Sequence, residues 1–290
     1  MSLFLESLIE SLKSNREINE ILANITGGNI REVVNFVKKF IGNPNVDTDK
    51  IVTIMSSQGK YVIPLHEFSK AAILGNYSHY NPESSLATNI FTVNYPDEKE
   101  HFLSPLILSF LFSGLSPEDS DGFITGKEII EEMQRLHFSI KQVEGNIRNL
   151  TNRRLIETTQ RVTFEESEVG LIGELPSAFR LTTVGSYHLN RWLATFAYLD
   201  AMVFDTPIFD EKIFEKFLPN LEKFDIDVRL ERTKQFRQYL NSVWNNSGLS
   251  VSYFDWNTII KRDRESFLGV EKAVAKNKHE RDITRRRREN

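Results

Sequence analysis

Apolar side chains recur at helical spacing throughout the first 58 residues. One series runs from Phe4 to Leu12 and a second from Ile18 to Ile25. Residues three or four positions apart share one face of a helix. The pattern predicts two helices within 3–25, split near Ser14 and Asn15. A third begins at Ile30 and stops at Gly42-Asn43-Pro44, and a short fourth follows Asp47.

Residues 59–101 have no sustained period. Glycine and proline interrupt this stretch, and aromatic residues recur between them. We predict a helix over 65–74 and a strand over 90–94, and we interpret the whole stretch as a connector packed against its neighbours.

Residues 102–206 show a fixed order of patterns. A helix over 102–113 is followed by a short extended piece at 122–125, helices over 126–136 and 139–153, a strand over 155–163, an acidic loop, a strand over 178–182 and a long helix from Thr183. Thr125 and Ser139 are suited to cap the middle helices. This order resembles a winged helix, a variant of helix-turn-helix. The phrase from Asn149 to Glu157 resembles the end of a recognition helix running into the first wing strand.

Composition narrows the possible chemistry. The absence of cysteine excludes disulfides and thiolate metal sites and favours a reducing compartment. No apolar run reaches 18 residues, so we predict a cytoplasmic protein without a membrane span. The six histidines include no pair at i, i+4, and no Gly-x-Ser-x-Gly occurs, so we assign no metal site and no catalytic residue.

The segment Thr26-Gly27-Gly28-Asn29-Ile30-Arg31 lies between two helical series. An arginine at a helix start offers phosphate a permanent charge and a planar fork of donors. The arrangement resembles the lid subdomain of AAA+ and related STAND-type P-loop ATPases. That resemblance implies that Arg31, with Asn29 beside it, senses the terminal phosphate of a nucleotide. The plain alternative is a capped helix with a surface arginine.

The rest of such an ATPase has no counterpart in the sequence. No Gly-x-x-x-x-Gly-Lys-Ser/Thr loop occurs, and Gly122 to Glu128 has the wrong spacing. We therefore expect no cofactor in this chain, and the resemblance implies ATP and Mg²⁺ only for a missing P-loop domain. A second chain would supply that domain, or this chain is a fragment of a longer product, which we favour.

The helix over 139–153 carries polar residues off its apolar face. Such side chains read base edges or anchor phosphates. The candidates for binding DNA or a protein partner are Lys141, Gln142, Arg148, Asn149, Asn152, Arg153 and Arg154. Against DNA stands the acidic loop that follows, with Glu165, Glu166, Glu168 and Glu174. Residues 121–189 hold eight basic and ten acidic residues, so we favour protein contact and keep double-stranded DNA open.

The sequence as a whole predicts a mainly α protein. Its parts are a helical lid-like subdomain (1–58), a connector (59–101), a winged-helix domain with a small β wing (102–206), a helical extension (207–270) and a basic, partly disordered tail (271–290) ending in Arg285–Arg288. We interpret it as the non-catalytic C-terminal region of a bacterial regulatory ATPase. The alternatives are a stand-alone winged-helix DNA-binding regulator and a structural adaptor.

Overall fold

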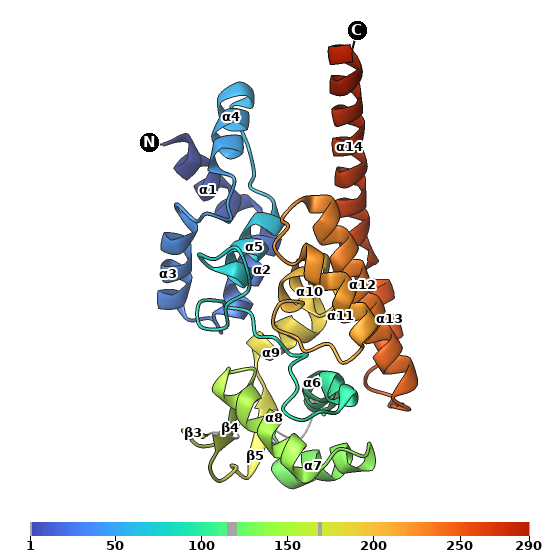
Figure 1. The fold of residues 1–290 in the computed structure, drawn as a ribbon. Coiled ribbons are helices and arrows are strands. Elements are labelled where there is room, and N and C mark those ends of the chain that lie inside the picture. Colours follow the sequence, from blue (N-terminus) through green and yellow to red (C-terminus); the bar gives the residue numbers. More distant parts are fainter. Residues whose placement is uncertain (1, 115–120, 168–169, 290) are drawn as a thin grey trace.

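Figure 1 shows the computed structural model of the chain, which describes residues 2–114, 121–167 and 170–289, and side chains as far as residue 279. Its N-terminal helices lie on one side and its C-terminal helices on the other. Helices α7 and α8 and the small strands lie at one end, below both groups. The molecule is mainly α with a small β wing, as the sequence predicts.

The predicted N-terminal helices are all present. They are α1 (Leu3–Ser14), α2 (Arg16–Ile25), α3 (Ile30–Phe40) and α4 (Thr48–Gln58), followed by α5 (Leu65–Leu74). Asn15, Asn29 and Asp47 begin α2, α3 and α4, because each side-chain oxygen accepts a backbone N–H of the first turn. Phe4, Phe40 and Phe68 join these helices through stacked rings.

The connector has irregular backbone over residues 90–94, where we predicted a strand. Residues 90–94 are not a strand, because side chains take their backbone donors: Ile90 N–H donates to the Tyr198 hydroxyl and Phe91 N–H to the Asn89 amide oxygen. A short 3₁₀ helix, η1 (Glu98–Phe102), then leads into the next unit.

The order predicted for residues 102–206 is confirmed. It comprises α6 (Leu103–Ser113), β1 (Ile124–Thr125), α7 (Gly126–Arg135), α8 (Ile140–Asn152), β2 (Ile156–Thr158) and β5 (Ala178–Leu181). The three strands form an antiparallel sheet in the order β1-β5-β2. We call residues 103–193 the wing unit. Thr125 and Ser139 form capping boxes with Glu128 and Gln142.

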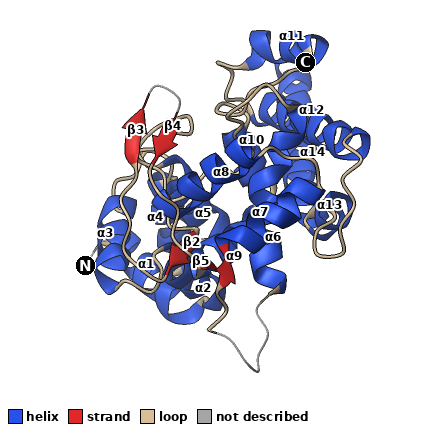
Figure 2. Cartoon of the chain, turned by 90° about the horizontal axis from the view of Figure 1, so that it is seen from below, coloured by secondary structure: helices blue, strands red, loops and turns tan. Residues whose placement is uncertain are grey.

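The loop between β2 and β5 contains structure that the sequence did not predict. Its hairpin is formed by β3 (Glu165–Ser167) and β4 (Gly170–Ile172), shown in red beside the main sheet in Figure 2. β2 is shorter than the predicted strand over 155–163. Glu168, one of the acids counted against DNA binding, lies outside the described residues.

The long helix predicted from Thr183 is interrupted. α9 (Thr183–Tyr187) passes into a π-helical turn, η2 (His188–Trp192), and α10 (Phe196–Met202) starts afresh. The cause is local: Leu193 N–H donates to the carbonyl of His188, five residues back, which widens the turn.

The C-terminal part is helical as predicted. It consists of α11 (Glu211–Phe217), the 3₁₀ turn η3 (Leu218–Asn220), α12 (Ile226–Asn246), α13 (Trp256–Arg262) and α14 (Arg264–Glu289). The tail that we expected to be partly disordered belongs, from residue 271 to 289, to α14, which extends beyond the body in Figure 1. Its charges alternate in sign, as on a surface helix.

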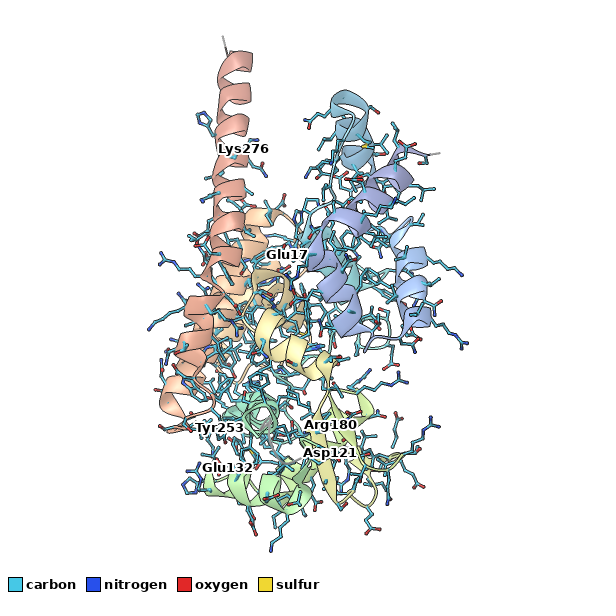
Figure 3. The ribbon with its side chains drawn as sticks, turned by 180° about the vertical axis from the view of Figure 1, so that it is seen from behind. Glu17, Asp121, Glu132, Arg180, Tyr253 and Lys276 are labelled. Atoms are coloured by element: carbon cyan, nitrogen blue, oxygen red, sulfur yellow. The ribbon has the colours of Figure 1, made fainter. Side chains whose placement is uncertain are left out.

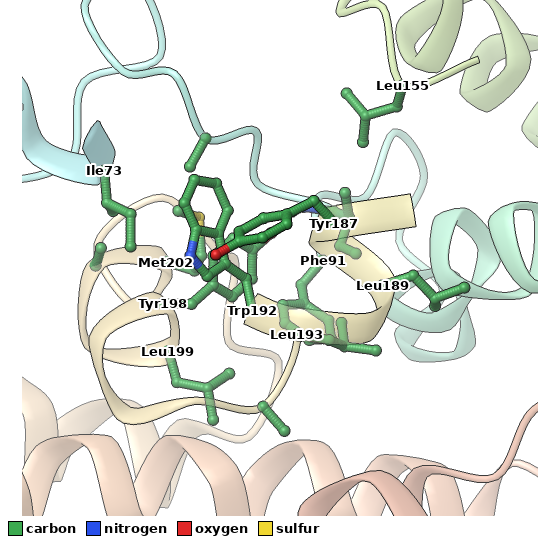
Figure 4. Packing of buried hydrophobic residues seen from close by; sticks show 14 of the residues in the cluster. Ile73, Phe91, Leu155, Tyr187, Leu189, Trp192, Leu193, Tyr198, Leu199 and Met202 are labelled. Carbon is green, nitrogen blue, oxygen red and sulfur yellow. The ribbon is translucent and has the colours of Figure 1, made fainter. Parts of the chain in front are cut away.

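Phe91 of the connector contacts several parts of the core. Phe91 is fully buried, and its ring lies 5.7–6.3 Å from the rings of Phe102, Tyr198, Phe236 and Trp256. Figure 4 shows Phe91 close to the residues of η2 and α10. One continuous apolar cluster runs from Phe4 to Val274, so burial couples the N-terminal helices to the C-terminal ones.

Two polar contacts fix the outer elements of the wing unit, one to the C-terminal part and one within the unit itself. The hydroxyl of Tyr253, which follows α12, donates to Glu132 of α7 at 2.8 Å. Arg180 of β5 donates to the carbonyl of Asp121 at 2.9 Å. Both pairs lie at the wing-unit end of the molecule in Figure 3. They hold the sheet and α7 in register with the rest.

A buried ion network joins α10 to α12. The carboxylate of Asp200 accepts from Arg229 at 2.6 Å, and from Arg232 and Thr233 at 3.2 Å each. The side chain of Arg232 is only 1% exposed. A buried guanidinium is tolerated only when a counter-charge and acceptors satisfy it.

We predict that Asp200→Ala lowers the free energy of unfolding by about 3–5 kcal/mol, because it leaves Arg232 buried without its counter-charge. Glu83→Ala is the matched control: it removes an exposed partner of Arg153 and should change the free energy by less than about 0.5 kcal/mol. Urea unfolding of both variants measures this. Equal effects of the two substitutions would contradict the role of Asp200.

Candidate functional site

The glycine turn between α2 and α3 places Arg31 at a helix start. Gly27 and Gly28 have φ of 60° and 74°, a left-handed conformation that glycine adopts without strain. Asn29 then caps α3 by accepting the backbone N–H of Arg31 at 3.0 Å. Within the described part of the chain, the exposed Arg31 side chain has no hydrogen bond or ion pair. It is therefore available to an anion from outside.

The same turn lies against the wing unit. A Cβ placed on Gly27 would be 3.9 Å from Val184 of α9. Seven residues away in each segment, Arg191 of η2 donates to Glu20 of α2 at 2.7 Å. A shift of the glycine turn would therefore press directly on the helix that follows the sheet.

Helix α8 is held through the carboxylate of Glu100, which is fully buried. Five N–H donors surround it. They are the backbone N–H groups of Asn94 and Tyr95 and the side-chain amides of Asn94, Gln142 and Asn146, at 2.9–3.1 Å. Gln142, predicted to contact DNA or a partner, is thus turned inward and only 6% exposed.

Two more predicted contact residues of α8 are engaged within the chain. Arg148 donates to the carbonyl of Gly173 at 3.0 Å and to Glu144 at 3.1 Å, and its side chain is 15% exposed. Asn149 donates to Asn94 at 3.4 Å. Strand β4 packs along the same helix. The middle of α8 is consequently covered by the wing hairpin and by the connector.

The two ends of α8 remain open. Lys141 is exposed in the first turn, and Asn152, Arg153 and Arg154 are exposed at the end. Arg153 donates to the carbonyl of Pro82 at 3.0 Å and approaches Glu83 at 3.4 Å. Arg154 has φ of +60°, which is unusual for a residue other than glycine.

A groove of about 1250 Å³ brings two of the predicted features together. Asn29 of the glycine turn lines it, as do Asn152, Arg153 and Arg154 at the end of α8. Arg31, Lys141, Gln142, Arg148 and Asn149 are not among its lining residues. We call this cavity the arginine groove, because Arg161 and Arg180 also line it.

Sequence reasoning missed several residues of this region. Arg161 and Arg180 belong to the groove only because β2 and β5 pair, and their own neighbours in sequence give no sign of it. Glu100 meets Asn146 from 46 positions away. The strand pattern could have indicated Arg180, whereas nothing local marks Glu100.

His188 fixes the connector to η2. Its Nδ1–H donates to the carbonyl of Val184 at 2.8 Å, so its Nε2 is the acceptor for the N–H of Thr88 at 2.9 Å. A second proton on Nε2 would break the Thr88 contact. Complete burial lowers the pKa of His188 from 6.5 to about 4.

The described residues contain no group of three or more histidine, aspartate or glutamate side chains able to hold a metal ion. Among the helices described, none is long and apolar enough to cross a bilayer.

We predict that Glu100→Gln lowers the free energy of unfolding by about 2–3 kcal/mol. The NH₂ group of the glutamine would point at N–H donors that now bond to a carboxylate oxygen, so those donors would lose their acceptor. Glu98→Gln, an exposed change two residues away, is the control and should be nearly neutral. Urea unfolding at neutral pH measures both. If Glu100→Gln were as mild as Glu98→Gln, the carboxylate network would not be stabilising.

We predict that His188 makes stability depend on acid pH. Its folded pKa lies below the unfolded value, so the contribution is present above pH 6.5 and is lost as pH falls toward 4, by about 3 kcal/mol in all. His188→Gln should therefore cost much stability at pH 7.5 and progressively less at lower pH. Urea midpoints of both proteins across the pH series measure this. A penalty independent of pH would contradict the buried neutral imidazole.

The comparisons with known proteins add no information to the geometry. No protein-family model, no curated protein and no solved structure matches this chain. The exposed Arg31, the occupied helix α8 and the arginine groove are therefore the grounds on which its function is argued.

Proposed function

We propose that this chain is the non-catalytic, regulatory part of a nucleotide-dependent ATPase. The observation that carries the proposal is the double position of the glycine turn. On one side it presents the unpaired Arg31 to solvent, and on the other it lies against α9 of the wing unit. A displacement of the glycine turn caused by binding at Arg31 would therefore reach α9 of the wing unit directly.

The proposed input is a nucleotide held by another module. A guanidinium at a helix N-terminus suits a terminal phosphate, because the permanent charge adds to the partial positive charge of the helix end. In this proposal ATP and Mg²⁺ are bound by a P-loop module, and Arg31 with Asn29 completes the contact. This chain contributes the sensor and performs no chemistry.

The proposed output is the wing unit. The Gly27–Val184 approach and the Glu20–Arg191 ion pair connect the turn to α9 and η2. These helices follow β5 directly, so their displacement would tilt the sheet. Because the middle of α8 is covered, we propose that the wing unit docks on protein rather than reading base edges.

The alternative of a stand-alone DNA-binding regulator has one observation in its favour: Asn152 and Arg154 are exposed at the end of α8. It requires Gln142 and Asn149 to leave their partners and face a major groove. Release of Gln142 would take one of the five donors away from the buried Glu100 carboxylate, which is costly. A structural adaptor, the third possibility, needs no response to nucleotide at all.

We predict that millimolar ATP protects residues 26–34 and 183–193 of this chain from hydrogen exchange, because Arg31 and the start of α3 bind the terminal phosphate weakly. Arg31→Ala should abolish the protection. Arg16→Ala is the matched control, since Arg16 is also exposed at an asparagine-capped helix start and should leave the protection intact. Exchange read by mass spectrometry with and without Mg²⁺–ATP measures this.

Each outcome decides between the possibilities. Protection confined to 26–34 would support nucleotide contact and overturn the path to the wing unit. Absence of protection at both segments, or protection that survives Arg31→Ala, would overturn the sensor and leave an adaptor.

A further inference from the structure

We propose that the arginine groove binds the phosphodiester backbone of single-stranded nucleic acid without base preference. The groove is lined by Arg153, Arg154, Arg161 and Arg180 against two acids, Glu32 and Glu157. This local excess of positive charge stands out in a chain whose formal net charge is −4. The inference does not depend on nucleotide sensing by Arg31, which lies outside the groove lining.

Two of the four arginines are free to take a phosphate. Arg153 is paired with Glu83, and Arg180 with Glu157 at 2.5 Å. Arg154 and Arg161 are exposed, and in the described ranges their guanidinium groups have no hydrogen bond or ion pair. Unpaired guanidinium groups lining one groove are what repeated phosphates along a strand would contact.

The rest of the lining suits a sugar-phosphate chain. Asn152 at the end of α8 and Thr159 after β2 line the groove and can donate to phosphate oxygens. The hydroxyls of Thr26, Thr151 and Thr158 also line it, but each already donates to a backbone carbonyl. Phe164 is 8% exposed, so it offers little surface for stacking a base. Because no aromatic platform stacks a base and the unpaired cations contact phosphates, we expect no sequence preference.

The shape of the site favours a single strand over a duplex. The groove is a concavity between the glycine turn, residues 82–88 and β2, and a flexible strand can follow such a surface. A duplex is stiff and convex, and proteins read it by inserting an element into its major groove. The middle of α8, the element placed to do so, is covered.

Arg154 occupies a backbone position where glycine would be easier. It follows the end of α8, where Leu155 N–H donates to Leu150 O and Arg154 N–H to Thr151 O, a helix-ending motif that usually has glycine at the left-handed residue. An L-residue costs about 1–2 kcal/mol there. The chain thus retains a charged side chain at the mouth of the groove in spite of local strain.

This strain provides a clean test. Arg154→Gly removes the cation and relieves the backbone, so the variant should fold at least as well as the parent. His137→Gly is the matched control: His137, at φ 64°, ends α7 in the same way, is exposed and does not line the groove. The probe is a fluorescein-labelled oligothymidine, titrated by anisotropy into the full chain over a range of salt.

We predict that the parent binds the oligothymidine with an affinity that falls as salt rises. Arg154→Gly and Arg161→Ser should each weaken binding several-fold and reduce the slope of log K against log salt by about 0.7, the value for one single-strand phosphate contact. His137→Gly should bind like the parent. An oligomer of mixed sequence should bind with the same affinity as oligothymidine.

Four results would overturn the proposal. One is no salt-dependent binding of the parent at low salt, and another is parental affinity in a folded Arg154→Gly. The third is a duplex bound more tightly than the single strand and weakened by Lys141→Ala, which would place binding on α8. The fourth is loss of binding in Arg31→Ala but not in Arg154→Gly, which would assign the phosphate contact to the glycine turn.

Discussion

The buried carboxylate of Glu100 is the constraint on which the arrangement of the wing unit depends. An ionised group away from water is stable only when donors replace its hydration, and here five N–H groups do so. Two of these donors are side chains of α8 and three belong to residues 94–95. The carboxylate therefore fastens the connector to α8 and uses up the polar side chains that a recognition helix would turn toward DNA.

Two other contacts between elements also depend on buried polar groups, although the Nε of Arg232 has no hydrogen-bond partner in the part of the chain that the structure describes. Asp200 holds α12 against α10 through Arg229 and Arg232, and His188 holds η2 to the connector as a neutral imidazole. Each of these groups joins segments far apart in sequence. Arg31 at the glycine turn and Arg154 and Arg161 in the arginine groove, in contrast, are exposed and keep their guanidinium groups unpaired within the described residues.

Much of the fold follows from local pattern. Local sequence carries the signal for the helical periods, for the asparagine and aspartate caps and for the two capping boxes. Each of these features depends on residues within four positions of one another. The strands β1, β2 and β5 followed from their order relative to α7 and α8. The π turn at His188 was missed, because the apolar pattern of residues 184–202 is the same whether Leu193 N–H donates to the carbonyl four or five residues back. The contact of His188 with Thr88, 100 residues away, was also out of reach of local pattern.

The candidate site was less accessible to sequence reasoning. Polar residues off the apolar face of α8 were predicted to be free, yet a polar face can be buried when polar partners cover it, and the partner Glu100 has no local signature. The arginine groove is assembled from residues 25–32, 82–88, 151–164 and 180–184, which only the tertiary fold brings together. Asn29, Asn152, Arg153 and Arg154 were candidates because their side-chain types suit phosphate or base edges, and all four line the groove. Their roles remain proposals.

The most direct test of the occupied helix is the exchange of its side-chain amide protons, observed by NMR in the free chain. The account predicts that the amide protons of Gln142 and Asn146 exchange far more slowly than those of the exposed Gln134, because the Glu100 carboxylate holds them away from water. Exchange of Gln142 and Asn146 as fast as that of Gln134 would contradict it and return α8 to the role of a helix open to DNA.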